Sequence, residues 1–179
     1  MKRRALLVLV VAQLLVTSPT IAADRDASLI NSFQVLCTLE KPDFERIDQK
    51  ATAMKLPVHQ DLRAPISGTM FSRSKSWVVT LTTGNHELVA TEANGPRGHI
   101  VSCGISAIDP NGDTFKNEVI AAMKLGEPST QVVSPDGSMR MTIWKNAFGE
   151  GTTLRFVDAS PRSAPGAFLA YDVEEPPKR

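Results

Sequence analysis

The chain of 179 residues contains two cysteines, Cys37 and Cys103, and their chemistry is the most direct prediction of the sequence. In an oxidising compartment an even pair of cysteines is expected to form a disulfide. The bond would close a loop of 103 minus 37, or 66, residues, which stabilises a folded protein by about 4 kcal/mol through loop-closure entropy. Two buried, unpaired thiols are the alternative. A catalytic thiolate is disfavoured because Cys103 lies in an apolar run.

Two histidines and two tryptophans are the candidate ligand contacts: Trp77, His86, His99 and Trp144. His86 and His99 flank adjacent predicted strands, with Glu87 and Glu92 nearby, and imidazole and carboxylate groups bind divalent metals. Their spacing does not match a metal-binding motif, so no metal site is predicted. Tryptophans on strands could stack on a ligand, but they fill cores more often.

A segment that begins like a calcium-binding loop follows the strand predicted over 99–108. Asp109, Asn111 and Asp113 have the spacing of the first three ligands. However, Thr114 stands where the loop needs glycine and Ile120 where it needs a carboxylate. A turn in which Asp113 caps a helix explains the polar residues equally well. Because no nucleophile elbow, phosphate-binding loop or dinucleotide fingerprint occurs, neither a catalytic residue nor a cofactor is predicted.

The first 23 residues have the composition of an export signal. A positive start at positions 2–4 precedes an apolar stretch over 5–16 and a polar, small-residue end over 17–23. The apolar stretch is shorter than the roughly 20 residues that a transmembrane helix needs. We therefore expect residues 1–23 to be cleaved and Asp24 to become the N-terminus. An uncleaved signal anchor is the alternative.

Removal of the signal peptide changes the charge of the chain. Twenty Lys and Arg minus three leaves 17, against 19 Asp and Glu, so the mature net charge is near −2. This balance argues against nucleic acid as a partner, because binding to phosphates relies on clustered positive charge. We expect a periplasmic or secreted protein, without stable membrane insertion, that has one domain over 24–174 and a flexible tail over 175–179.

Helical and strand-like segments alternate along the mature chain. Apolar residues at helical spacing predict helices over 27–37, 42–56 and 114–125. Alternating and β-branched runs predict strands over 77–82, 87–93, 99–108, 131–134, 138–144, 152–159 and 167–173. Residues 58–75 contain few periodic apolar positions, so they are predicted to be mostly loop. This segment is a candidate contact surface, with an ordinary connector as the alternative.

The two halves of the mature chain share markers in the same order. Ala51–Leu56 before a proline resembles Ile120–Leu125 before a glycine. Further matches lie 66 to 68 positions apart: Trp77 with Trp144, 88–93 with 154–159, and Gly98 with Gly166. These markers predict an α+β fold with helices on one face of an antiparallel sheet. In it, a helix and a three-strand meander occur twice, over about 42–108 and 113–173. Turns recur in any antiparallel protein, which is the alternative explanation.

Several of these features occur together in a known group of proteins. They are a leader, a helix that ends in a cysteine, the strand Cys103-Gly104-Ile105-Ser106-Ala107 and a following Asp-Pro-Asn-Gly-Asp turn. In this pattern, over most of the mature length, the chain resembles small exported proteins of proteobacteria that have no assigned activity. The resemblance therefore implies export and a structural role for the shared motifs.

Two classes of function fit the sequence. Small size, a disulfide and the lack of catalytic motifs favour a noncatalytic exported binding module, for example an inhibitor or immunity-type protein that acts on another envelope protein. The alternative is a small-ligand carrier or hydrolase that uses a cleft between the two predicted repeats, because such interfaces often form clefts. The first class predicts a tight protein partner, and the second predicts a pocket with a histidine or carboxylate.

Overall fold

The computed structural model describes residues 20–62, 71–95, 98–108, 112–159 and 166–176. Most of the predicted signal peptide, the Asp109 to Asn111 turn and the last three residues lie outside this part of the chain. The described residues form α-helices and one antiparallel sheet of eight strands, as expected for an α+β fold.

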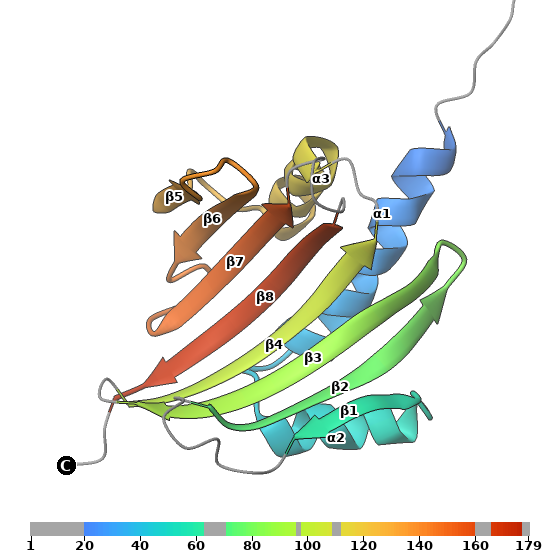
Figure 1. Ribbon diagram of the computed structural model, residues 1–179, viewed down its shortest axis with the longest axis vertical. Helices are drawn as coiled ribbons and strands as arrows, with labels where there is room; N and C mark the ends of the chain where they lie inside the picture. Colours follow the sequence, from blue (N-terminus) through green and yellow to red (C-terminus); the bar gives the residue numbers. More distant parts are fainter. Residues whose placement is uncertain (1–19, 63–70, 96–97, 109–111, 160–165, 177–179) are drawn as a thin grey trace, which may run out of the picture.

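The helices lie on one face of the sheet, behind the strands in Figure 1. They are α1 (Thr20–Phe33), α2 (Phe44–Ala53) and α3 (Gly112–Met123), and α1 continues into a π-helical turn, η1 (Gln34–Thr38). Asp43 caps α2, because its carboxylate accepts a hydrogen bond of 3.0 Å from the backbone N–H of Arg46. Apolar residues at helical spacing face the sheet from α2 and α3: Phe44, Ile47, Ala51, Phe115 and Val119.

Each of the helices α2 and α3 is followed by four strands. The strands after α2 are β1 (Val58–Leu62), β2 (Phe71–Leu81), β3 (Gly84–Gly95) and β4 (Gly98–Ile108). Those after α3 are β5 (Thr130–Val133), β6 (Met139–Lys145), β7 (Thr152–Ala159) and β8 (Gly166–Glu175). We call α2 with β1–β4 the first half and α3 with β5–β8 the second half.

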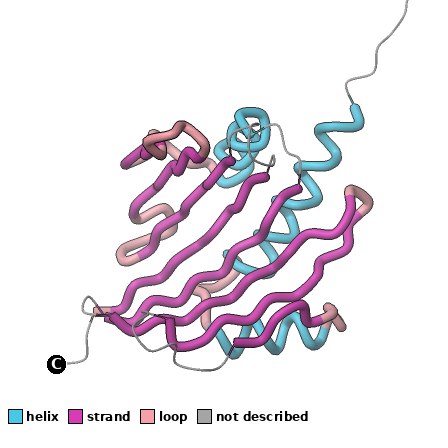
Figure 2. Tube along the Cα trace, in the orientation of Figure 1, coloured by secondary structure: helices cyan, strands magenta, loops and turns pink. Residues whose placement is uncertain are grey.

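The two halves join at the centre of the sheet. The strand order is β1-β2-β3-β4-β8-β7-β6-β5, so β4 pairs with β8 and the short strands β1 and β5 form the edges. Figure 2 shows this uninterrupted sheet with the helices on one side. Cys103 in β4 lies opposite Tyr171 in β8, at the middle of the central pair.

The hydrophobic core lies between the helices and the sheet. Side chains alternate between the two faces of a strand, and β7 shows this most clearly, because buried and half-buried residues alternate along its whole length. In the core, Phe33 of α1 contributes a fully buried ring, and Phe115 of α3 packs on Phe156 of β7 with ring centroids 5.6 Å apart. The opposite face of the sheet carries no helix among the described residues.

The structure corrects part of the prediction for residues 58–75. Residues 58–62 form β1 and residues from 71 onward form β2, so this segment is not mostly loop; residues 63–70 lie outside the described part. The β1 strand was missed because all five of its residues are exposed, which removes the alternation of apolar and polar side chains that marks a strand. The first half therefore has four strands where three were predicted, whereas all four strands of the second half were predicted, so the unit in each half is larger than the expected three-strand meander.

Candidate functional site

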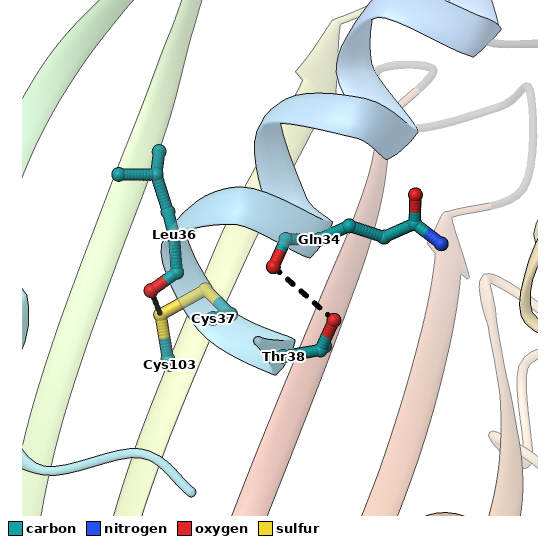
Figure 3. The surroundings of a disulfide bond; sticks show 5 residues. All are labelled: Gln34, Leu36, Cys37, Thr38 and Cys103. Atoms are coloured by element: carbon teal, nitrogen blue, oxygen red, sulfur yellow. Dashed lines mark hydrogen bonds between the residues drawn. A yellow bond between two sulfur atoms is a disulfide. The ribbon is translucent and has the colours of Figure 1, made fainter. Parts of the chain in front are cut away.

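Cys37 and Cys103 form the expected disulfide. The bond joins η1 to the central strand β4 across 66 residues, with Cα atoms 5.4 Å apart. Figure 3 shows the bond beside the carbonyl oxygen of Leu36, which lies 3.9 Å from Cys103 Sγ, and the Thr38 hydroxyl, which donates to the Gln34 carbonyl at 3.2 Å. Because both cysteines are buried, the bond fixes the N-terminal helix on the sheet and leaves no free thiol for chemistry.

The two tryptophans that were candidate ligand contacts lie in the core. Trp77 is 1% exposed and Trp144 is 3% exposed. Trp77 lies opposite Leu88 on the neighbouring strand, and Trp144 lies opposite Leu154 in the same way. The indole N–H of Trp144 donates to the carbonyl of Gly126 at 2.9 Å. Both rings therefore pack beneath the helices and offer little surface to a ligand.

The two histidines lie at opposite ends of the β3–β4 ladder. His86 is buried, and its ring nitrogens lie 2.8 Å from the Thr83 hydroxyl and 3.1 Å from the Ser106 carbonyl. His99 is directly across the ladder from Asn94, and its Nε2 is 3.1 Å from a Glu92 carboxylate oxygen. The structure thus does not bring the two histidines together. In the part of the chain that is described, no three His, Cys, Asp or Glu side chains form a metal-binding group.

An arginine on the helix-covered face of each half joins a strand to a helix. In the first half, Arg73 of β2 binds Glu92 of β3 and Glu45 of α2. Its guanidinium also lies 3.9 Å from the centroid of the Phe44 ring, within cation–π distance. Burial works to lower the pKa of Arg73, but the hydrogen bonds that its guanidinium donates to Glu45 and Glu92 outweigh burial, so the pKa is raised.

The second half contains the same arrangement. Arg140 of β6 binds Asp158 of β7 and Asp113 of α3, each at 2.6 Å. The hydrogen bonding of Arg140 to the Asp158 carboxylate, which accepts, is the main cause of the raised pKa of Arg140. The bond from Arg140 lowers the pKa of Asp113, with a smaller contribution from Lys116. In each half, the arginine thus links a strand to the neighbouring strand and to the helix that covers them.

The helix-free face of the second half carries a row of apolar side chains. Val132, Met141, Val157 and Phe168 lie directly opposite one another on β5, β6, β7 and β8. Val132 is 46% exposed and the other three are half-buried. Two further apolar side chains on the same face of β6, Met139 and Ile143, flank Met141. We call these six residues, Val132, Met139, Met141, Ile143, Val157 and Phe168, the apolar row.

Phe168 closes the inner end of the apolar row against β4. A Cβ atom added to Gly104 would lie 2.3 Å from Cζ of Phe168, so the ring lies directly on this glycine. Gly104 belongs to the Cys-Gly-hydrophobic-Ser-Ala strand that the sequence singled out, and its small size makes room for the ring. The motif therefore has a packing role in the described structure.

A charged pair borders the apolar row without entering it. Arg155 of β7 lies beside Ile143 and binds Asp172 of β8 through both carboxylate oxygens, with Nη2 to Oδ1 at 2.8 Å. The hydrogen bonds that Arg155 donates to Asp172 raise the pKa of Arg155, although burial works against this shift. Because this pair is mutually neutralised, the surface beside it stays suited to an apolar partner.

The first half lacks the apolar row at corresponding positions of its own ladder. Met141 and Val157 face each other across β6 and β7, whereas Ser74 and Thr91 face each other across β2 and β3. Ser76 likewise stands 67 positions before Ile143. The corresponding positions of the first half thus carry hydroxyl side chains where the second half carries apolar ones.

Sequence reasoning did not identify the apolar row. The signal was present, because Met139, Met141 and Ile143 alternate with Arg140, Thr142 and Trp144, which gives β6 one wholly apolar face and a tryptophan on the other. Large apolar side chains on both faces of a strand indicate either burial on both sides or an exposed contact surface. Only the position of the helices distinguishes the two.

A groove of about 510 Å³ lies beside α1 in the first half. Its walls come from α1 and η1, from the end of α2 and from the end of β2. Apolar side chains predominate, including Val35, Met54, Leu56, Val79 and Leu81. Ser28, Asn31 and Thr80 add polar groups, but no charged residue and no histidine lines the groove. A pocket of this kind suits an uncharged, mainly apolar ligand.

Comparison with known proteins gives no relative: no family model matches the chain, and no curated protein or solved structure is significantly similar to it. None of the described helices is long and apolar enough to cross a membrane.

Proposed function

We propose that this protein is a noncatalytic exported binding module that contacts another envelope protein through the apolar row on the helix-free face. The observation that carries the proposal is the difference between the two halves: the half-buried Met141 and Val157 lie on the helix-free face where the first half has Ser74 and Thr91. Exposed apolar patches on folded domains mark contact sites for other proteins. Methionine suits such surfaces because its flexible thioether adapts to a partner.

We also propose that the two halves arose by internal duplication. The comparison of Met141 and Val157 with Ser74 and Thr91 depends on this origin, because it treats them as corresponding positions. The Arg73–Glu92 pair in β2 and β3 corresponds to Arg140–Asp158 in β6 and β7, with offsets of 67 and 66 positions. The contacts from Arg73 to Glu45 and from Arg140 to Asp113 extend the correspondence to the helices. Such matched pairs support a common origin because they involve non-local contacts as well as local turns.

A twofold relation between the halves also accounts for the pairing at the centre. Leu88 lies opposite Ile105 across β3 and β4, and Leu154 lies opposite Tyr171 across β7 and β8, so both partners are displaced by 66 positions between the halves. Gly104 and Ala170 lie 66 positions apart and face each other across β4 and β8. These registers support two equivalent units related by an axis at Gly104 and Ala170.

Site-specific photo-crosslinking in the native cell tests the proposed surface. A photoreactive phenylalanine analogue at Met141 is expected to form a covalent adduct with a second polypeptide in the cell envelope, identified by mass spectrometry. The same analogue at Ser74, the corresponding position of the first half, is the matched control and should give no such adduct. Equal adducts at both positions, or none at either, would refute the proposed surface.

A second candidate function, a small-ligand carrier, is supported by the groove beside α1. This groove lies between α1 and the first half, and not between the two halves as the sequence predicted for such a carrier. Binding of the apolar fluorophore N-phenylnaphthylamine tests it. Met54→Glu changes the groove and should weaken binding at least about tenfold, whereas Leu39→Glu changes an exposed apolar residue outside the groove lining and should not. Equal binding by both variants would exclude this site.

A further inference from the structure

The two edges of the sheet differ in how well they are protected against pairing with another strand. The β1 edge contains an irregularity between Val58 and Gln60, the acidic residue Asp61 and a charged pair in which His59 Nδ1 lies 2.9 Å from Glu87. Bulges and charges are the usual means by which sheet edges avoid unwanted partners. The β5 edge, Thr130–Val133, is regular and carries no charged residue.

The hydrogen-bond alternation of an antiparallel ladder shows which groups of β5 point outward. The N–H of Ser134 donates to the carbonyl of Met139 at 2.9 Å, which makes these two residues a hydrogen-bonded pair. Since such pairs alternate along the ladder, Val132 bonds to β6. Just before the strand, the N–H of Ser129 donates to the carbonyl of Ile143 at 2.8 Å. Gln131 and Val133 therefore direct their N–H and C=O groups away from β6, and no described strand lies on that side.

We propose that two copies of this protein pair through β5, edge to edge and antiparallel, around a twofold axis at Val132. In this register Gln131 of one copy and Val133 of the other exchange their outward N–H and C=O groups, and the symmetric pair does the same. The inference goes beyond the proposed function, because it concerns self-association and holds whether or not another protein binds.

The lack of charge in β5 and the continuity of this edge with the apolar row favour a second copy of the protein as its partner. An isologous contact places the same surface against itself, so any charge in β5 would meet its own copy or a near neighbour. The strand Thr-Gln-Val-Val has none. The pairing would also place Val132 opposite Val132 of the second copy on the helix-free face. The two rows from Val132 through Met141 and Val157 to Phe168 would then become one row of double length.

A proline at position 131 tests the pairing without removing a backbone hydrogen bond of the β5–β6 ladder, and the side-chain hydrogen bond from Gln131 Nε2 to the Thr142 hydroxyl, 3.4 Å, is lost in the alanine control as well. The N–H of Gln131 points outward in the derived alternation, so Gln131→Pro removes a donor used only by the second copy, as is tolerated at sheet edges. Gln131→Ala keeps that donor and is the matched control. In sedimentation equilibrium at up to about 1 mM protein, a weak dimer is expected because a four-residue edge is a small interface.

Gln131→Pro should weaken dimerisation at least about tenfold, which is about 1.4 kcal/mol, while Gln131→Ala should stay close to the wild type. Circular dichroism of each variant verifies that the monomer fold is kept. The proposal is overturned if the wild type is monomeric at every concentration, because the edge would then be left to a different protein. It is also overturned if the Gln131→Pro variant is folded and dimerises as strongly as the wild type.

Engineered cysteines test the register directly. In the proposed pairing, residue 132 of one copy lies opposite residue 132 of the other. The variant Val132→Cys should therefore form an intermolecular disulfide under oxidising conditions, with the bond between Cys37 and Cys103 kept intact. Thr130→Cys is displaced from its own copy by about 13 Å, given the rise of a strand, and should form little. Equal crosslinking of both variants, or none with Val132→Cys, would contradict this register. Photo-crosslinking at Met141 reports on a different contact, so the two proposals fail independently.

Discussion

Lys55 and Lys124 end α2 and α3 with the same unusual backbone. Both have positive φ angles, 55° and 53°. The N–H of Lys55 donates to Thr52, and that of Leu56 donates to Ala51 five residues back; Lys124 and Leu125 repeat these bonds to Ala121 and Ile120. The left-handed residue at a helix C-terminus is usually glycine, because a side chain there is strained. Two lysines in this conformation are among the closest local correspondences between the halves.

Replacing either lysine by glycine should stabilise the protein. Lys55→Gly and Lys124→Gly each relieve the strain of a left-handed side chain, and the expected gain is about 1 kcal/mol in the free energy of unfolding. Urea denaturation measures it. Lys50→Gly, inside α2, is the control and should lose about 1 kcal/mol. A loss of stability in both left-handed variants would show that the lysine side chains themselves hold the helix ends.

Removing the disulfide should weaken the fold substantially. The double variant Cys37→Ala, Cys103→Ala loses the constraint on a loop of 66 residues, for which we expect a loss of about 4 kcal/mol. Urea denaturation with and without reductant compares the variant with the wild type. Reduced wild type should approach the variant, since both lack the same bond. A variant as stable as the oxidised wild type would contradict the assigned role of the bond.

Gly104→Ala should disturb the inner end of the apolar row. The new methyl group would lie 2.3 Å from the Phe168 ring, and we expect a loss of about 1 to 3 kcal/mol in the free energy of unfolding. In a double-mutant cycle, Phe168→Leu should recover part of this loss. Gly126→Ala has no atom within 4 Å of its new methyl group and is the control. Equal losses for the two alanine variants would argue against the packing of Phe168 on Gly104.

Asp136 should titrate far below an ordinary aspartate. Hydrogen bonds from the Ser134 hydroxyl and from Ser138 lower its pKa from 3.8 to about 2. Because the folded pKa is below the unfolded one, its stabilising contribution is present above the unfolded pKa and is lost as the pH falls through about 2. Carbon NMR of the side-chain carboxyl measures the midpoint, and Ser134→Ala should raise it. A wild-type midpoint near 3.8 would contradict the turn geometry.

Local patterns predicted much of the fold. The alternation around Trp77 and over 152–159 gave the strands, and the apolar spacing of Phe44, Ile47 and Ala51 gave α2. The disulfide followed from an even cysteine count alone. These features depend on residues close in the sequence or on composition, which one sequence records directly.

Features that depend on non-local pairing could not be read in the same way. The contact of β4 with β8 brings Cys103 to Tyr171 across the whole second half, and no local pattern specifies that register. The sequence also did not show which face of β6 is exposed, because an apolar residue such as Met141 can occur at a buried or at an exposed position. Trp77 and Trp144, selected as candidate ligand contacts, are instead covered by the helices.

The most direct test of the central claim is native mass spectrometry of the envelope extract from cells that express either the wild type or the variant Met141→Ser, Val157→Thr. This variant gives the second half the residue types of Ser74 and Thr91, with both proteins expressed at matched levels. The account predicts a complex with a second polypeptide for the wild type and its loss for the variant, which remains folded. The same complex with both proteins, or no complex with the wild type, would contradict the claim that the apolar row binds a partner.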